Sequence, residues 1–362
     1  HFAPCKGEMV LFLFIYWGGI YMLKKYLSKV IKGEHLSQEE SRQAMQIIMN
    51  GNATDAQIGS FLTALKVKGE ISEEISGFAH TLLQHADRVK HSKPVICPCG
   101  TGGDTKGTFN VSTTVAFVLA GGGVAVAKHG NRSVSSACGS ADVLSQLGVI
   151  VDKSADKVSE EIEHLDIGFL FAPALNKAMR VVANPRKELG FRTVFNLLGP
   201  IINPAQLDYQ LVGVYEESLT EKVAEVLNLI GVKQAMVVHS EDGMDEISTN
   251  FPTKVSEMRN GKVKTYHIDP QRYGFKRGTL ADYQGGNPEE NAKIIRAILN
   301  GEKGPKRDIV LLNAAAGFYI TNKTPSITEG IRLAEKTIDS GAALVKLEAL
   351  IAFSREGIEN AC

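Results

Sequence analysis

The segment PVICPCGTGGDTKGTFNVSTTVAFVLAGGGVAVAKHGNRSVSSACGSADVLSQL, residues 94–147, decides the fold class of this chain. It contains two short apolar runs, 95–97 and 124–127, and each is followed by a polar stretch rich in glycine. A helical pattern of apolar residues then follows each stretch, over residues 113–120 and 140–147. Short strands that alternate with helices are typical of βαβ units, so this segment predicts a mainly parallel sheet.

The same alternation continues beyond residue 147. Apolar runs at 167–171, 210–214 and 235–239 predict further strands, and periodic segments at 155–165 and 218–230 predict helices. Asn260-Gly261 separates two strand-like runs over residues 255–266, which is typical of a β-hairpin. Helical patterns return from residue 287 onward.

Upstream of residue 94 the patterns are helical throughout. Ser37 and Thr54 begin capping boxes that open two helices, and another helix begins after Ser72. We therefore expect an α/β fold with a small all-helical N-terminal domain and a larger α/β domain around a mostly parallel central sheet. The predicted helical domain covers residues 22–92 and is completed by helices around residues 174–203, and the α/β domain covers residues 93–362.

Composition narrows the class of function. The chain has 362 residues, and its 40 Lys and Arg are balanced by 40 Asp and Glu. Proteins that bind the nucleic-acid backbone usually carry a basic excess, so we expect no nucleic-acid partner. The five cysteines form an odd, scattered set that makes a poor disulfide framework. This indicates a reducing compartment, and we expect a cytoplasmic protein.

Residues 1–21 do not match the rest of the chain. Their apolar run, 9–17, is shorter than the roughly 20 residues that a membrane helix needs, and no Ala-x-Ala cleavage pattern follows it. We expect no membrane partner. Our hypothesis is that Met22 is the natural start and that residues 1–21 are an apolar leader, either untranslated or disordered. Mass spectrometry of the natural N-terminus tests this.

The first polar stretch has the features of a phosphate cradle. Glycines between Gly100 and Asp104 let the backbone approach a ligand closely, and the N-terminus of the next helix offers free N–H groups. Asn110, Ser112 and Thr113 add side-chain donors. The spacing fits neither the Walker pattern nor the dinucleotide fingerprint. The alternative is a tight turn with a helix cap.

The second polar stretch supports the first. Lys128 and Arg132 supply positive charge at the end of the next predicted strand, and serines follow them. Parallel strands place their carboxyl ends at one edge of a sheet, where open α/β folds bind ligands. We therefore expect both stretches to meet at one crevice, although a solvated polar loop is the alternative.

Two further motifs could complete such a site. Asp245-Glu246, beyond the strand at 235–239, offers adjacent carboxylates of the kind that bind hard cations. The alternative is that the pair is simply solvent-exposed, as most such pairs are. Arg186 and Arg192 could each grip a carboxylate with two parallel hydrogen bonds, or could belong to an ion-paired helix face.

These motifs, in this order, resemble those of the anthranilate phosphoribosyltransferase family of tryptophan biosynthesis. The similarity extends from about Met22 to near the C-terminus and includes residues 100–104, 110–113, 128–132, 139–142, 186–200 and 245–246. It implies a helical domain and an α/β domain, as in pyrimidine nucleoside phosphorylases. It also implies transfer of the 5-phosphoribosyl group from phosphoribosyl diphosphate to the amine of anthranilate, with Mg²⁺ as cofactor, in a homodimer.

The resemblance also assigns roles to residues. Phosphoribosyl diphosphate would be bound by Gly100, Gly103, Asp104, Thr108, Asn110, Val111, Ser112, Thr113, Lys128, His129, Gly130, Asn131, Arg132, Ser133, Val134, Ser135, Ser136 and Ser140. Anthranilate would be bound by Gly100, Asn131 and Arg186, and the metal by Ser112, Asp245 and Glu246.

Lys128 and Asn131 are the expected catalytic residues. Lys128 would stabilise the leaving diphosphate, whose negative charge grows as the bond to C1 breaks. An arylamine nucleophile is already neutral at pH 7 and needs no strong base, so we rank His129 below Lys128 and Asn131 as a catalytic group.

One position departs from the family pattern. Asn176-Lys-Ala-Met179 stands where the family often has His-Pro-Ala-Met, so the strength of anthranilate binding is in question. Two alternatives to the transferase remain. One is a pyrimidine nucleoside phosphorylase, whose phosphate loop typically has a different sequence, and the other is a non-catalytic paralogue that binds nucleic acid.

Overall fold

The computed structural model describes residues 23–104, 106–133 and 137–355. The predicted leader at 1–21 and the predicted ligand residues Val134, Ser135 and Ser136 lie outside this part of the chain. The described residues divide into two units: one contains the residues up to Ala86 together with Asn176–Ile202, and the other contains Asp87–Leu175 and the residues from Asn203 onward. The first boundary falls a few residues before the one predicted at residue 92.

The first unit is all-helical. A helix over residues 23–31 precedes α2 (Gln38–Met49), α3 (Asp55–Lys68) and α4 (Ser72–His85), and η1 (Lys177–Val182), α9 (Ala183–Leu189) and α10 (Val194–Ile201) join them from later in the chain. Both predicted capping boxes form, at Ser37 and at Thr54. Helices α2 and α4 pack so closely that a Cβ added at Gly77 would lie 2.4 Å from the carbonyl oxygen of Gln38.

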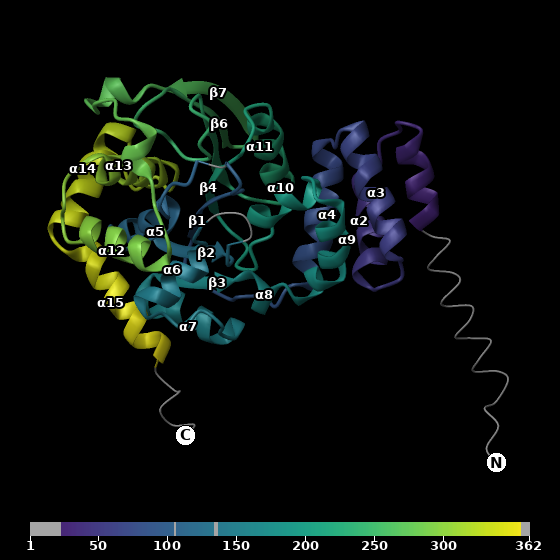
Figure 1. Cartoon of the computed structure of the whole chain (residues 1–362), viewed down its shortest axis with the longest axis horizontal. Coiled ribbons are helices and arrows are strands. Elements are labelled where there is room, and N and C mark those ends of the chain that lie inside the picture. The colour runs from purple at the N-terminus through teal and green to yellow at the C-terminus, as the bar shows by residue number, and fades with distance from the viewer. Residues whose placement is uncertain (1–22, 105, 134–136, 356–362) are drawn as a thin grey trace, which may run out of the picture. The chain divides into compact units, whose positions relative to one another are not determined.

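The second unit is built on a seven-stranded sheet with the order β3-β2-β1-β4-β5-β6-β7 (Figure 1). Its strands are β1 (Val95–Gly100), β2 (Ala125–Gly130), β3 (Ile167–Phe171), β4 (Tyr209–Gly213), β5 (Gln234–Ser240), β6 (Thr253–Arg259) and β7 (Lys262–Ile268). Strands β1 to β5 pair in parallel, and the hairpin β6–β7 is antiparallel. Asn260 and Gly261 both have positive φ, 52° and 73°, as a two-residue hairpin turn requires.

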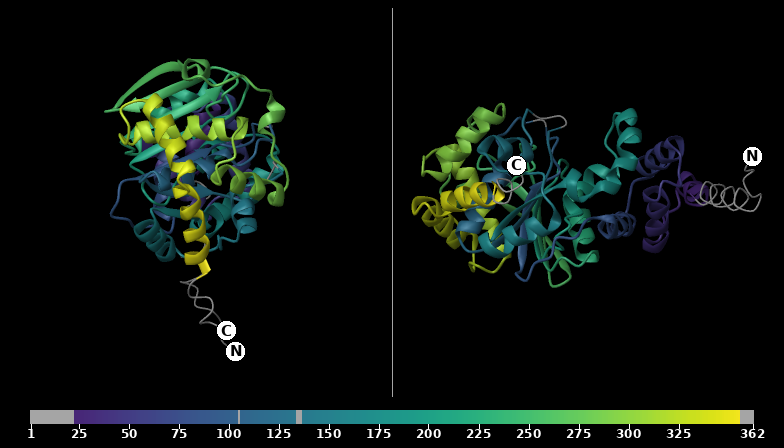
Figure 2. Two further views of the ribbon diagram at one scale, coloured as in Figure 1. Left: turned by 90° about the vertical axis from the view of Figure 1, so that its left-hand side faces the viewer. Right: turned by 90° about the horizontal axis from the view of Figure 1, so that it is seen from below.

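Helices cover both faces of this sheet. Helix α5 (Val111–Gly121) is buried from Val115 to Ala120 because it packs between the sheet and the C-terminal helices. These are α12 (Pro288–Leu299), α13 (Pro305–Ile320), α14 (Ile327–Asp339) and α15 (Ala342–Arg355), on one face in Figures 1 and 2. The remaining helices are α6 (Ser140–Leu147), α7 (Ala155–Leu165), α8 (Ala172–Leu175), α11 (Leu219–Leu229) and the short turns η2 (Pro270–Tyr273) and η3 (Leu280–Tyr283).

The strand order reverses between β1 and β4. From β1 the chain moves to β2 and β3 on one side, then returns to β4 and β5 on the other. In open α/β sheets, ligands bind outside the carboxyl ends of the strands at such a reversal. The predicted α/β class with a mostly parallel sheet is confirmed. By this rule we expect a ligand site beyond Gly100 and Gly213, which are paired at the ends of β1 and β4.

Candidate functional site

The glycine-rich loop after β1 turns at residues with left-handed backbone. Gly102 and Gly103 have φ of 66° and 74°, where a side chain would be strained. The loop is held at both ends: Thr101 N–H donates to the carbonyl of Gly213 at 2.9 Å, and Phe109 N–H donates to the carbonyl of Tyr283 at 3.0 Å. The glycines therefore shape the loop, and these backbone bonds fix it at the carboxyl end of β1.

Strands β1 and β2 separate as they approach the site. Their ladder pairs only Val95 and Ile96 with β2, so beyond this point β1 has one free edge, which accommodates Pro98 without loss of a ladder bond. Side chains bond the separated strands instead. His129 N–H donates to Cys97 Sγ at 3.4 Å, and Asn203 Nδ2 donates to the carbonyl of Ala127 at 2.9 Å.

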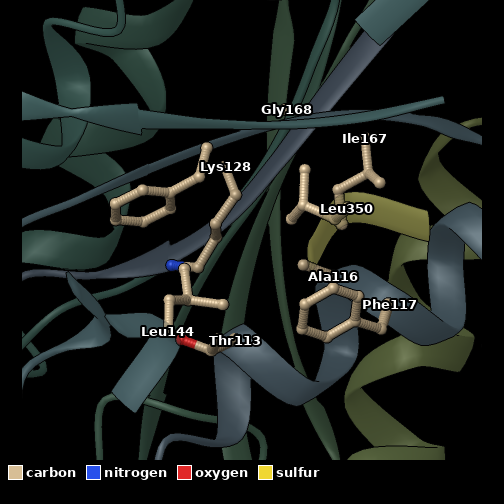
Figure 3. A pocket seen from close by; sticks show the side chains of 9 residues that line it. Thr113, Ala116, Phe117, Lys128, Leu144, Ile167, Gly168 and Leu350 are labelled. Carbon is tan, nitrogen blue, oxygen red and sulfur yellow. The ribbon is translucent and has the colours of Figure 1, made fainter. Parts of the chain in front are cut away.

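Lys128 and His129 lie on opposite faces of β2, as successive residues of a strand must. The stem of Lys128 is buried, and Figure 3 shows it beside Thr113, Phe117 and Leu144 around a cavity of about 10 Å³, the size of a single water. Lys128 Nζ donates to Ser112 Oγ at 3.4 Å. The end of β2 and the start of α5, which belong to the two polar stretches, are therefore in contact, with Lys128 on the side of α5.

The N-terminus of α5 connects these groups to the carboxylates. The backbone N–H of Ser112 donates to the Glu246 carboxylate. Asn110, just before the helix, does not cap it with its side chain; its Nδ2 donates to the carbonyl of Cys138 at 3.2 Å, and its Oδ1 accepts from Asn291 Nδ2 at 3.0 Å. The Asn110 amide is thus held in place by its neighbours on both sides.

Asp245 lies directly over the ends of β1 and β4. Its Oδ2 accepts the N–H of Gly102 at 2.8 Å. A Cβ added at Gly100 would lie 2.5 Å from this Oδ2, and one added at Gly213 would lie 1.5 Å from the Asp245 carbonyl oxygen. Our sequence analysis missed Gly213. The available signal was a glycine at the end of the apolar run at 210–214, where a strand meets a loop.

The two carboxylates of this cluster have raised pKa values, unlike most carboxylates on a protein surface. Burial and the nearby charge of Asp104 raise the pKa of Asp245 to about 7. Burial and the charge of Asp245 raise the pKa of Glu246 well above its usual range, although Lys128 opposes this. Carboxylates that are partly removed from water and repel one another disfavour their own ionised form, so the cluster favours a ligand that brings positive charge.

The donors present fit a magnesium ion held jointly with a phosphate ligand. Within the described ranges, no group of three or more His, Cys, Asp or Glu side chains is arranged to hold a metal by itself. Mg²⁺ is usually bound by one or two carboxylates together with substrate phosphates and water. Asp245 and Glu246 supply the one or two carboxylates that such a site needs from the protein, and Ser112 adds a hydroxyl.

The loop after β2 is closed at its base by Asp142. Its Oδ2 accepts the N–H groups of Ser133 and Gly139 at 2.9 and 3.0 Å, and Oδ1 pairs with Arg132 at 3.1 Å. Burial alone would raise the pKa of Asp142, but these donors outweigh it and hold the pKa below its ordinary value.

The same closure involves Asn131, an exposed residue. Its carbonyl accepts Ala141 N–H at 3.1 Å and Ser140 Oγ at 3.3 Å, and its Oδ1 accepts Arg132 N–H at 2.7 Å. Asn131, Arg132, Ser133 and Ser140 are therefore gathered at one loop base.

Arg186, Arg192 and Asn176 belong to the helical unit. The Arg186 guanidinium lies over the Phe195 ring at 5.4 Å, and burial lowers its pKa. In the part of the chain that the structure describes, Arg186 forms no ion pair, unlike the ion-paired face offered as an alternative. Asn176 is buried, and its Nδ2 donates to the carbonyl of Ile202 at 3.5 Å.

We predict that Asp142→Asn lowers the free energy of unfolding by about 1 kcal/mol at pH 7, since two backbone N–H groups lose a charged acceptor. The folded-state pKa is depressed, so the wild-type advantage is present above the ordinary value of 3.8 and is lost as the pH falls below it. Urea unfolding at pH 3 to 8 measures this. The exposed variant Asp152→Asn is the control, and a deficit that does not change with pH contradicts the assignment.

No helix among the described residues is both long and apolar enough to cross a membrane.

Models of a glycosyl transferase family match most of the chain. The model of its helical bundle domain matches residues 24–86, and the model of its a/b domain matches residues 92–344. The chain is 54% identical to the anthranilate phosphoribosyltransferase of Acetivibrio thermocellus over 338 residues, which are 93% of this chain and 98% of that protein. It is 52% identical to that of Methanocorpusculum labreanum over 335 residues, 92% and 98% of the two chains.

Solved structures agree. The anthranilate phosphoribosyltransferase of Thermus thermophilus superimposes with a TM-score of 0.87 at 44% identity, covering 91% of this chain and 99% of that one. The Saccharomyces cerevisiae anthranilate phosphoribosyltransferase in complex with PRPP and Mg superimposes with a TM-score of 0.85 at 30% identity. The superposition covers 92% of this chain and 97% of the yeast chain. The fold and the resemblance inferred from the motifs are confirmed: the chain belongs to this glycosyl transferase family and, within it, to the anthranilate phosphoribosyltransferases.

Proposed function

We propose that this chain transfers the 5-phosphoribosyl group of phosphoribosyl diphosphate to the amine of anthranilate, with N-(5-phosphoribosyl)anthranilate and diphosphate as products. The observation that carries the proposal is the convergence of two anion-binding loops on one carboxylate turn. Gly102 bonds to Asp245, and Lys128 bonds to Ser112, whose N–H bonds to Glu246. Neighbouring strands thus supply backbone donors, a cation and metal-binding oxygens at one place, as a sugar diphosphate requires.

The substrate's phosphates are assigned to the two loops. The positive end of the α5 dipole and the Lys128 ammonium favour a polyanion at this position. The proposed ligand residues for phosphoribosyl diphosphate are Gly100, Gly103, Asp104, Thr108, Asn110, Val111, Ser112, Thr113, Lys128, His129, Gly130, Asn131, Arg132, Ser133, Val134, Ser135, Ser136 and Ser140.

Ser112, Asp245 and Glu246 are the proposed ligands of Mg²⁺. The yeast relative, of the same family, was solved in complex with PRPP and Mg. When bound there, the ion would offset the negative charge that develops on the diphosphate as its bond to the sugar breaks. The raised pKa values of Asp245 and Glu246 are consistent with a site that gains stability from a cation.

Catalysis is assigned to Lys128 and Asn131, with no general base. The buried Lys128 stem is packed against apolar side chains, so its ammonium is held in place before the substrate arrives. A preorganised charge of this kind stabilises the leaving diphosphate without the cost of reorientation. His129 lies on the other face of β2, which supports its rank below Lys128 and Asn131. Positioning of the two substrates supplies the rest of the rate gain.

Anthranilate is assigned to Gly100, Asn131 and Arg186. A yeast relative was solved in complex with 4-fluoroanthranilate. Arg186 offers a planar, two-donor group that matches a carboxylate, and its stacking on Phe195 orients that group. Asn176 bonds to a backbone carbonyl within the same unit, so we assign it no contact with the substrate. We also propose a homodimer and a cytoplasmic location.

A fluorescence assay of anthranilate consumption tests the proposal. Signal loss is expected only when phosphoribosyl diphosphate and Mg²⁺ are both present, with release of diphosphate in equal amount. Phosphorolysis of uridine or thymidine without anthranilate turnover would instead indicate a nucleoside phosphorylase. A salt-sensitive gel shift without turnover would indicate the nucleic-acid-binding paralogue.

Arg186→Ala is expected to raise the KM for anthranilate about tenfold or more, because the substrate carboxylate loses a charged two-donor partner. The KM for phosphoribosyl diphosphate is expected to change far less. The exposed variant Arg180→Ala removes the same charge nearby and is the control. Steady-state kinetics with each substrate varied in turn measures the two KM values. Equal rises in both would refute the assignment.

Asp245→Asn combined with Glu246→Gln is expected to reduce activity most strongly at limiting Mg²⁺. Both ionised carboxylates are disfavoured by burial, so neutral amides of the same shape should leave the fold intact. The rate is measured against Mg²⁺ concentration, with the exposed Glu241→Gln on the same loop as control. If activity at limiting Mg²⁺ stays at the wild-type level, the metal role is wrong.

A further inference from the structure

Helix α13 carries one amide in its buried apolar middle. Asn313 has no exposed surface and lies among Leu311, Leu312, Ala314 and Ala315, which are also buried. Burying an amide is unfavourable unless its donor and acceptor are both bonded. Helix propensity also disfavours Asn at such a position compared with Leu or Ala. The residue therefore needs an explanation outside the helix itself.

The explanation lies in the backbone of a single residue, Ile247. Asn313 Oδ1 accepts the N–H of Ile247 at 2.9 Å, and Asn313 Nδ2 donates to the carbonyl of Ile247 at 2.8 Å. Its second N–H bonds within α13, to the carbonyl of Ile309 at 2.8 Å. Ile247 is buried and lies outside every strand of the sheet. One side chain thus replaces the sheet partner that this peptide lacks.

Ile247 directly follows Glu246, so this clamp ends the carboxylate turn. The other end is fixed by Ser240, whose N–H donates to the carbonyl of Met244 at 3.0 Å. Only Asp245 and Glu246 lie between these two anchors. The two carboxylates repel each other, and a free backbone would let them move apart. Anchors on both sides keep them together at the ends of β1 and β4.

We propose that Asn313 is a positioning residue that holds Asp245 and Glu246 in the geometry needed to bind the divalent cation with the substrate diphosphate. This inference rests on the proposed function. Asn313 touches neither substrate nor metal; it acts through the Ile247 peptide. Residues that orient metal ligands typically change metal affinity tenfold to a hundredfold when they are replaced.

Asn313→Leu, which is similar in size and cannot form the two bonds to Ile247, provides the test. Mn²⁺ binding in the presence of inorganic diphosphate is followed by the loss of the free-ion signal in electron paramagnetic resonance. We expect about tenfold weaker Mn²⁺ binding and about tenfold more Mg²⁺ for half-maximal activity, with the KM for anthranilate changed less than about twofold. Unchanged Mn²⁺ affinity and Mg²⁺ dependence would overturn the proposal.

Ser354→Ala is the matched control. Ser354 is also a buried polar residue on a C-terminal helix, and its Oγ accepts a loop N–H, that of Ile150, at 3.1 Å. Its loss is expected to lower the melting temperature without altering Mn²⁺ affinity. An equal loss of Mn²⁺ affinity in this variant would reduce Asn313 to a general stabilising role and overturn the proposal.

Two further outcomes are kept distinct. If Asn313→Leu does not fold, Asn313→Ser, which is smaller and leaves room for water, takes its place with the same expected direction and the same refuting result. If the wild type binds Mn²⁺ with diphosphate but does not consume anthranilate, the proposed function fails while the Asn313 test remains decisive. A wild type that binds no Mn²⁺ with diphosphate overturns the inference.

Discussion

The hydrogen bond from Gly102 N–H to Asp245 Oδ2 is the contact on which the rest of the site depends. It joins the loop after β1 to the turn after β5, across the point where the strand order reverses. The contact is possible because Gly100 and Gly213 have no side chain where Asp245 crosses the strand ends. Backbone geometry thus brings a buried carboxylate to the glycine-rich loop, and burial in turn makes that carboxylate sensitive to added positive charge.

A second set of contacts makes the site suitable for a diphosphate. Strands β1 and β2 lose their ladder before they end, and side chains such as Cys97 and Asn203 bond the free backbone groups instead. Lys128 can therefore lie beside the N-terminus of α5, close to Ser112. Asp142 closes the following loop at its base. Hydrogen bonds thus orient polar groups from three elements, and such prior orientation is the condition for electrostatic catalysis.

Much of this was predictable because it depends on local patterns. The apolar patterns at 167–171 and 140–147 predicted β3 and α6 with the bounds that the structure shows. The capping residues Ser37 and Thr54 predicted where α2 and α3 begin. Strand β1 was predicted too short, since its extension through Pro98 to Gly100 depends on pairing with β4. The roles of Gly213 and Asn313 could not be predicted, because each depends on a segment distant in sequence. The sequence motifs thus identified the candidate ligand residues, but they did not identify the distant residues that position them.

The most direct test of the central claim is a crystal structure of the chain with phosphoribosyl diphosphate and Mg²⁺. The account predicts the diphosphate between the Gly102 turn and Lys128, with the metal on the side of Asp245 and Glu246. A diphosphate bound elsewhere, or one held by only one of the two loops, would contradict it.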